Sequence, residues 1–119
     1  TAKKFTFRGK RLAERNTILN DAKLLENAGI FSVVLECVET KLAKSISNQL
    51  KIPTVGIGSS MNCDGQVLVV DDLIGLSESK FRFVKKYANI CQIIDNAVKK
   101  YKSEVLEGKF PKAKHSFKN

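Results

Sequence analysis

Two segments of the chain place apolar residues at the spacing of an α-helix. The first covers Leu12 to Ala28 and is followed by Gly29, where a left-handed C-cap is common. The second begins near Thr40, a residue type favoured at helix N-caps, and stops before Pro53. Their apolar stripes contain Ile18, Ala22 and Leu25 in the first segment and Leu42, Ile46 and Leu50 in the second.

Three short apolar runs alternate with these helices and follow them: SVVLE at 32–36, PTVGIG at 53–58 and GQVLVVDD at 65–72. The first run is continuous, which is typical of a strand covered on both faces of its sheet. Alternation of helix, short loop and strand predicts a parallel sheet with helices packed on it. Only nine residues lie between Ile57 and Val67, so we expect no more than one helical turn there.

The C-terminal third predicts a loop and then a long helix. Residues 73–80 include Gly75 and two serines and are expected to form the loop. The amphipathic segment that follows ends at Gly108, and a polar, basic tail comes after it. The tail contains His115, for which we expect a surface role. The apolar stripe of the segment is Val84, Tyr87, Cys91, Ile94, Val98, Tyr101 and Val105.

Acidic residues follow the ends of the predicted strands, and ligands bind at the carboxyl ends of parallel strands. Glu36 is the most informative, because Cys37 and Val38 continue the apolar run beyond it. A carboxylate in such surroundings is costly unless it is paired or used in chemistry. We also expect the loop 58–64 and Asp71–Asp72 to converge here, although the two aspartates could equally cap the next helix.

The turn GIGSS at 56–60 contains G-x-G after a predicted strand. It lacks a third glycine and an immediately following long helix, which argues against a dinucleotide-binding fingerprint. We expect the glycines to allow a sharp turn or a close approach of the backbone to a ligand.

Composition restricts the class of protein. A chain of 119 residues with 43% hydrophobic residues fits one globular domain. No apolar run is long enough to cross a bilayer, and the first residues do not resemble a signal peptide, so we expect a cytoplasmic protein without membrane contact. Cys37, Cys63 and Cys91 form no C-x-x-C pair, and we expect buried or half-buried thiols.

The formal net charge of +9 raises the question of nucleic-acid binding. The basic residues are mostly lysines scattered over helices and tail, without an arginine cluster or stacking aromatics among them. We therefore expect a solvated lysine surface and no nucleic-acid partner.

Three segments carry a resemblance to a known family: DAKLLENAGIFSVVLECVETKLAKSISNQLKIPTVGIG, DGQVLVVDDLIGL and FPKAKHSF. They resemble the C-terminal half of ketopantoate hydroxymethyltransferase, from about Phe5 to Phe117. The order and spacing of LECV, IPTVGIG and DGQVLV are the most specific features.

The resemblance implies an α/β fold, the C-terminal half of a (β/α)8 TIM barrel with parallel strands, flanking helices and a long C-terminal helix. Residues 1–119 would form one partial barrel domain, with the tail from about residue 107. The family belongs to pantothenate and coenzyme A biosynthesis and forms large homo-oligomers. It transfers a hydroxymethyl group from 5,10-methylenetetrahydrofolate to 3-methyl-2-oxobutanoate and makes 2-dehydropantoate.

The resemblance also implies a role for one residue. Glu36 matches the glutamate of the family's LECV motif, the proposed proton acceptor, and a buried carboxylate at a strand end suits that role. The family's Mg²⁺ chelates the keto acid, and its ligands, like the substrate-binding lysine, belong to an N-terminal half that this chain lacks. We therefore expect no metal ligand in this chain, and the sequence identifies no folate-binding residue.

Two positions depart from the family pattern. Ser59 and Ser60 follow Gly58 where Gly-Ala-Gly is usual, and Asp71 replaces a usual histidine. If the last glycine of that turn holds a positive φ, Ser60 would cost about 1 to 2 kcal/mol of backbone strain.

Length suggests a fragment. A (β/α)8 barrel needs about 250 residues, and Thr1 is not an initiator methionine. We expect the chain to be inactive alone and to associate with the missing half or with copies of itself. The alternative is a stand-alone basic α/β module with a binding or oligomerisation role. A third hypothesis, a lysine-driven RNA binder, predicts a steep dependence of affinity on salt.

Overall fold

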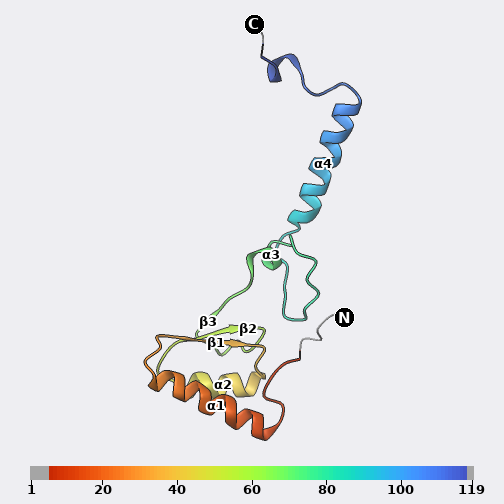
Figure 1. Ribbon diagram of the computed structural model, residues 1–119. Helices are drawn as coiled ribbons and strands as arrows, with labels where there is room; N and C mark the ends of the chain where they lie inside the picture. The colour runs from red at the N-terminus through yellow and green to blue at the C-terminus, as the bar shows by residue number, and fades with distance from the viewer. Residues whose placement is uncertain (1–5, 118–119) are drawn as a thin grey trace. The chain divides into compact units, whose positions relative to one another are not determined.

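The structure is a computed structural model that describes residues 6–117. Phe5, where the resemblance begins, and the last two residues of the predicted tail lie outside the described part. The chain divides into two compact units (Figure 1). The first comprises Thr1–Val69 and Ser79–Lys85, and the second comprises Val70–Glu78 and Lys86–Asn119.

The first unit contains a three-stranded parallel sheet in the order β1-β2-β3. The strands are β1 (Val33–Glu36), β2 (Thr54–Ile57) and β3 (Gly65–Gln66). Leu35 lies opposite Gly56, and Gly56 lies opposite Gln66. The prediction of an α/β fold with a parallel sheet is therefore confirmed. The third strand is much shorter than the predicted run 65–72.

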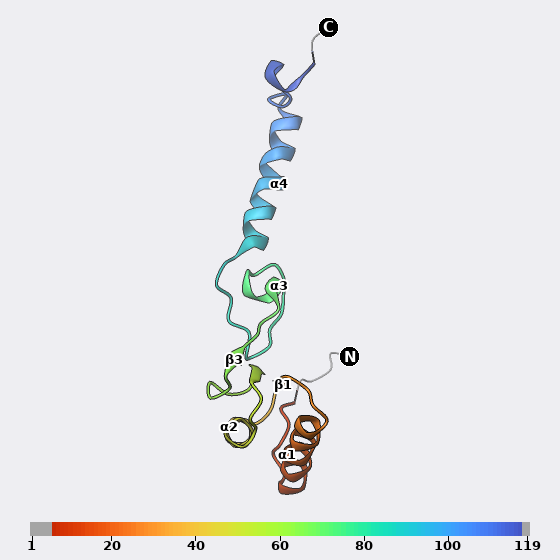
Figure 2. The same cartoon turned by 90° about the vertical axis from the view of Figure 1, so that its left-hand side faces the viewer.

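Helices α1 (Leu12–Asn27) and α2 (Thr40–Gln49) lie on one face of the sheet, as Figures 1 and 2 show. Both helices were predicted, and Gly29 has the expected left-handed backbone, with φ of 85°. The N-cap of α2 is Glu39, however, and not Thr40. The core between the helices and the sheet consists of Ala22, Leu35, Val38, Leu42, Ala43, Ile46, Leu50 and Cys63.

Among the described residues of the first unit, no helix lies on the opposite face of the sheet. Val34 alternates with buried Leu35 along β1, and Val34 is 58% exposed. The expectation that β1 is covered on both faces is thus not met by the described residues of the first unit.

The second unit contains α3 (Val70–Leu73), α4 (Ile90–Leu106) and the 3₁₀ helix η1 (Ala113–His115). The predicted long helix begins at Ile90 and not near Val84, and Asn89 caps it by accepting a hydrogen bond from the Gln92 backbone N–H at 3.3 Å. It ends before Gly108, as predicted. None of its residues is buried.

The cysteines differ in environment. Cys37 and Cys63 are buried, whereas Cys91, near the start of α4, is exposed, and all three are free thiols. The prediction of buried or half-buried thiols is therefore wrong for Cys91. Among the described helices none is long and apolar enough to cross a membrane.

Candidate functional site

Glu36 is the last residue of β1, at the carboxyl end of the sheet, as predicted. It pairs with Ile57, the last residue of β2, and its side chain points to the face opposite buried Leu35. Within this chain Glu36 is exposed, so the shelter expected for it is not provided by the described residues.

A left-handed residue ends the strand directly after Glu36. Cys37 has φ of 52°. Among the described residues other than glycine, it alone has a positive φ. Its N–H donates to the Ile57 carbonyl at 2.9 Å, and its carbonyl accepts from the Arg8 N–H at 2.8 Å. These bonds on both sides hold a conformation that costs about 1 to 2 kcal/mol, and such strain concentrates at functional sites.

Burial raises the pKa of the Cys37 thiol, and the nearby negative charge of Glu36 raises it further. A thiol with a raised pKa is neutral at pH 7 and is a poor nucleophile. The left-handed backbone of Cys37 shapes the strand end, and the raised pKa disfavours the reactive thiolate.

Glu39, the next acid along the chain, is occupied by structural contacts. Its carboxylate accepts hydrogen bonds from the backbone N–H groups of Lys41 at 3.1 Å and Leu42 at 3.0 Å, and Arg15 Nη1 lies 2.8 Å from Oε2. The two backbone bonds, followed by Arg15, lower the pKa of Glu39. Glu39 caps α2, and its lowered pKa makes it a weak base.

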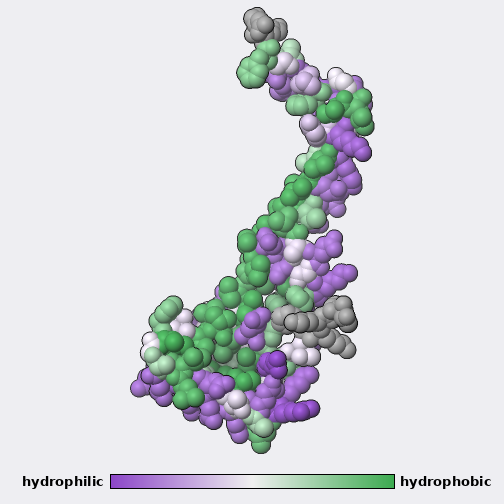
Figure 3. Space-filling model, in the orientation of Figure 1, coloured by the Kyte–Doolittle hydropathy of each residue, from purple (hydrophilic) through white to green (hydrophobic). Residues whose placement is uncertain are grey.

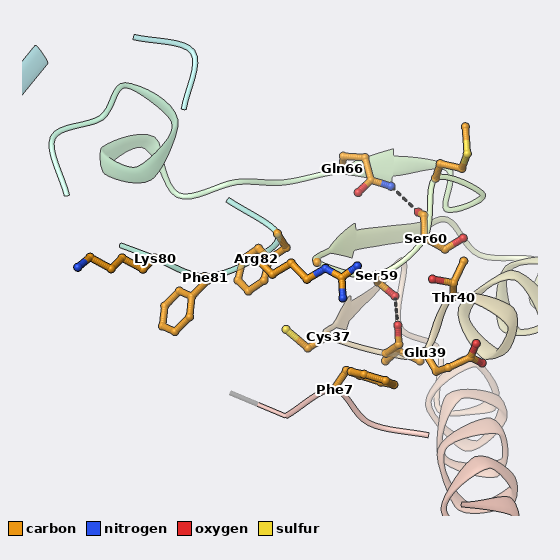
Figure 4. Close-up of a pocket in the computed structure, with 14 residues that line it drawn as sticks. Phe7, Cys37, Glu39, Thr40, Ser59, Ser60, Gln66, Lys80, Phe81 and Arg82 are labelled. Carbon is orange, nitrogen blue, oxygen red and sulfur yellow. Dashed lines mark hydrogen bonds between the residues drawn. The ribbon is translucent and has the colours of Figure 1, made fainter. Parts of the chain in front are cut away.

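The turn after β2 lies beside the end of β1. Gly58 has φ of 60°, and a Cβ at this position would come within 2.6 Å of Cγ of Phe83, so only glycine fits. The Ser59 hydroxyl donates to the Val38 carbonyl at 3.0 Å, which ties the turn to the residues after β1 (Figure 4).

Ser60 is not among the residues with positive φ, so the strain considered for it is absent. Its hydroxyl accepts from the Asn62 N–H at 3.1 Å, and its carbonyl accepts from Gln66 Nε2 at 2.7 Å. Serine is well accommodated here, and the residue is only 3% exposed.

The predicted convergence of acids is wrong for Asp64. Its carboxylate accepts from the backbone N–H and the hydroxyl of Thr54, the first residue of β2, so it lies at the amino end of that strand. Asp71 and Asp72 do not follow a strand either, because they belong to α3 in the second unit, where Asp72 accepts from the Ser77 hydroxyl.

A pocket of about 930 Å³ lies in the first unit, beside the carboxyl ends of β1 and β2 (Figure 4). Its walls include Cys37, Ser59 and Gln66, which lie at or just after the strand ends. They also include segment 80–83, which belongs to the part of the first unit that follows α3 in the sequence. Glu36 is not one of the lining residues. No role was predicted for segment 80–83, although its alternation of basic and aromatic residues, KFRF, was a local signal.

Within residues 6–117, no group of three or more His, Cys, Asp or Glu side chains is placed to hold a metal ion. Glu39 and Asp64 are engaged in the hydrogen bonds described above. The described residues therefore do not form a complete Mg²⁺ site.

Comparison with known proteins shows which family the chain is similar to. A family model described as ketopantoate hydroxymethyltransferase matches residues 1–113. A relative from Pelagibacter ubique (strain HTCC1062), named 3-methyl-2-oxobutanoate hydroxymethyltransferase, is 58% identical over 117 residues, which are 98% of this chain and 46% of the relative.

Two further relatives carry the same name. The protein of Syntrophus aciditrophicus is 53% identical and that of Pyrobaculum calidifontis is 49% identical, over 95% and 93% of this chain and 42% of each relative. The chain thus spans less than half the length of these curated relatives. Since the family model covers nearly all of the chain, the chain belongs to the ketopantoate hydroxymethyltransferase family.

Proposed function

We propose that this chain is the C-terminal half of a 3-methyl-2-oxobutanoate hydroxymethyltransferase. The complete enzyme would transfer a hydroxymethyl group from 5,10-methylenetetrahydrofolate to 3-methyl-2-oxobutanoate and form 2-dehydropantoate for pantothenate synthesis. The family match over residues 1–113 carries this proposal. The 46% coverage of the Pelagibacter ubique relative supports the view that a second half is needed.

The sheet supports a half barrel. In a (β/α)8 barrel, helices cover the outer face of a parallel sheet, and the inner face is filled by side chains from other strands. Here α1 and α2 cover one face, while Val34 and Glu36 on the other face are exposed. Strands of the missing half would close the barrel over this face, and the assembled enzyme would be a cytoplasmic homo-oligomer, as in the family.

Glu36 would be the general base. It lies at the carboxyl end of β1, the end of the strands at which barrel enzymes place their catalytic residues. Closure of the barrel would remove water from Glu36, and burial disfavours the charged carboxylate, which makes it a stronger base. It would accept the proton from C3 of the keto acid. Water would open the methylene bridge of the folate, so that tetrahydrofolate leaves and the one-carbon unit carries the oxygen of that water at the oxidation level of formaldehyde. The enolate carbon would attack this carbon, and its oxygen would become the hydroxyl of the product. The Mg²⁺ ligands would come from outside this chain.

The experiment is completion of the enzyme. The part of the Pelagibacter ubique relative that precedes the matching region is fused to this chain, and the product is called the completed protein below. We expect the completed protein to form 2-dehydropantoate from both substrates with Mg²⁺, while the 119-residue chain alone forms none at equal concentration.

The intact relative serves as the positive control. If the intact relative is active and the completed protein is folded but forms no product, the proposed function is wrong. A non-catalytic binding or oligomerisation module would then be favoured.

A further inference from the structure

The pocket beside the strand ends contains more positive than negative charge. Lys80 and Arg82 line it, and the one carboxylate in its wall is that of Glu39. Glu39 is already paired with Arg15 at 2.8 Å and with two backbone N–H groups of α2. The Glu39 charge is therefore already balanced, and among the described pocket residues no other carboxylate balances Lys80 and Arg82.

Arg82 is the better placed of the two cations. Its side chain reaches toward Ser59 and Cys37 at the strand ends, whereas Lys80 points away from the strands (Figure 4). No ion pair of Arg82 is recorded within the described part of the chain. A guanidinium offers planar, paired N–H donors that match a carboxylate, and it stays charged at all relevant pH values.

Aromatic side chains hold the segment that carries Arg82. The ring of Phe83 packs on Gly58, in the space that a Cβ would occupy. Phe81 and Phe83 stack with ring centroids 5.7 Å apart and an angle of 4° between their planes. Phe7 adds a third ring to the wall. The pocket thus combines flat apolar surfaces with cationic groups.

The size of the pocket helps to choose between the two substrates. Its volume of about 930 Å³ lies at the upper end of the range for drug-sized ligands, so it has room for a ligand larger than the small keto acid. A reduced folate has a flat ring system and a glutamate end with carboxylates, which is the chemistry that stacked aromatics and cations bind.

We propose that Arg82, with Lys80 at the outer edge, binds the carboxylates at the glutamate end of the folate co-substrate. This inference rests on the proposed function. It assigns Arg82 a binding role and no part in proton transfer, so its loss should affect the affinity for one substrate only.

The test is steady-state kinetics of the completed protein. Loss of a charge-assisted hydrogen-bonded pair corresponds to a rise in KM on the order of 10- to 100-fold. We expect Arg82→Gln to raise the KM for methylenetetrahydrofolate by this factor and to change the KM for the keto acid by less than about twofold. Arg82→Lys should give an intermediate value, and Lys80→Gln a smaller rise than Arg82→Gln.

Arg11→Gln is the matched control, because Arg11 is exposed at the start of α1 and makes no side-chain capping bond. An unchanged KM for folate in Arg82→Gln would overturn the proposal. A rise confined to the keto acid, or an equal rise in Arg11→Gln, would also overturn it.

A binding measurement separates this proposal from the proposed function. Titration calorimetry of 5-formyltetrahydrofolate into the completed protein needs no turnover. If the protein is inactive but binds this folate, and Arg82→Gln weakens binding at least about tenfold, the proposed function fails and the subsite stands. Absence of binding, or equal binding by both proteins, overturns the subsite.

Discussion

Three polar side chains secure the beginning of β2. Thr54 is completely buried, and its hydroxyl lies 2.7 Å from the Ser47 hydroxyl and 2.9 Å from Asp64 Oδ2. The Thr54 N–H donates to the same carboxylate oxygen at 2.8 Å. Hydrogen bonds from the backbone and then from the side chain of Thr54 lower the pKa of Asp64. Thr54 therefore connects α2, β2 and the loop that leads to β3.

We expect Thr54→Val to reduce the free energy of unfolding of the completed protein by about 1 to 3 kcal/mol. Valine has nearly the same shape but removes the hydroxyl that contacts Ser47 and Asp64, while the backbone N–H at position 54 still donates to Asp64. Urea unfolding followed by circular dichroism measures the difference. Thr17→Val is the control, because Thr17 is exposed on α1, and we expect it to change stability by less than about 0.5 kcal/mol. Equal effects of the two substitutions would contradict the role of Thr54.

At the level of residues, sequence placed Glu36 correctly at a strand end but did not foresee its exposure in this chain. An apolar flank indicates burial in the complete fold, and it does not show which part of the protein provides the cover. Asp64 was misplaced for another reason. Because Asp64 lies in a loop after β2, we expected it at the carboxyl end of the sheet. Its carboxylate instead accepts hydrogen bonds from Thr54, the first residue of β2, and therefore lies at the amino end.

At the level of elements, α1, α2, β1 and β2 follow from local periodicity because each has a clear apolar pattern. β3 is shorter than its apolar run because a strand needs a paired neighbour. Only Gly65 and Gln66 of this run pair with β2, opposite Val55 and Gly56. The start of α4 was also misjudged. The Tyr87 and Ile90 N–H groups donate to the carbonyls of Leu73 and Ile74, and local periodicity does not encode these contacts.

Helix α4 carries an apolar stripe that its own unit does not bury. Figure 3 shows hydrophobic side chains along one side of α4 and hydrophilic ones along the other. Val98, in the middle of the stripe, is 58% exposed. An amphipathic helix of this kind normally packs its apolar side on a core, so we expect the complete enzyme to cover it.

We therefore expect Val98→Glu to destabilise the completed protein by about 2 to 4 kcal/mol while leaving the isolated chain nearly unchanged. Asn96→Glu introduces the same charge on the exposed polar side of α4 and should have little effect in either protein. Thermal unfolding of the two substitutions, each made in the completed protein and in the isolated chain, measures this contrast. An unaltered unfolding temperature of the completed Val98→Glu protein would show that the stripe stays in water.

At the level of the whole molecule, the proposed function divides a catalytic barrel between this chain and a part outside it. The chain supplies one covered sheet face, a strand end with an acid, and a basic aromatic pocket. It does not supply a metal-binding cluster among the described residues. The proposed base can function only when the rest of the enzyme encloses it.

Proton removal from C3 of 3-methyl-2-oxobutanoate tests this account most directly. Exchange of the C3 hydrogen in D₂O, followed by NMR without folate, isolates this step from one-carbon transfer and from binding at Arg82. We predict exchange by the completed protein, none by the chain alone, and a decrease on the order of 100-fold or more in completed Glu36→Gln. Glu78→Gln, at another exposed acid, should exchange normally. Exchange at the unaltered rate in completed Glu36→Gln would contradict the assignment of Glu36 as the base.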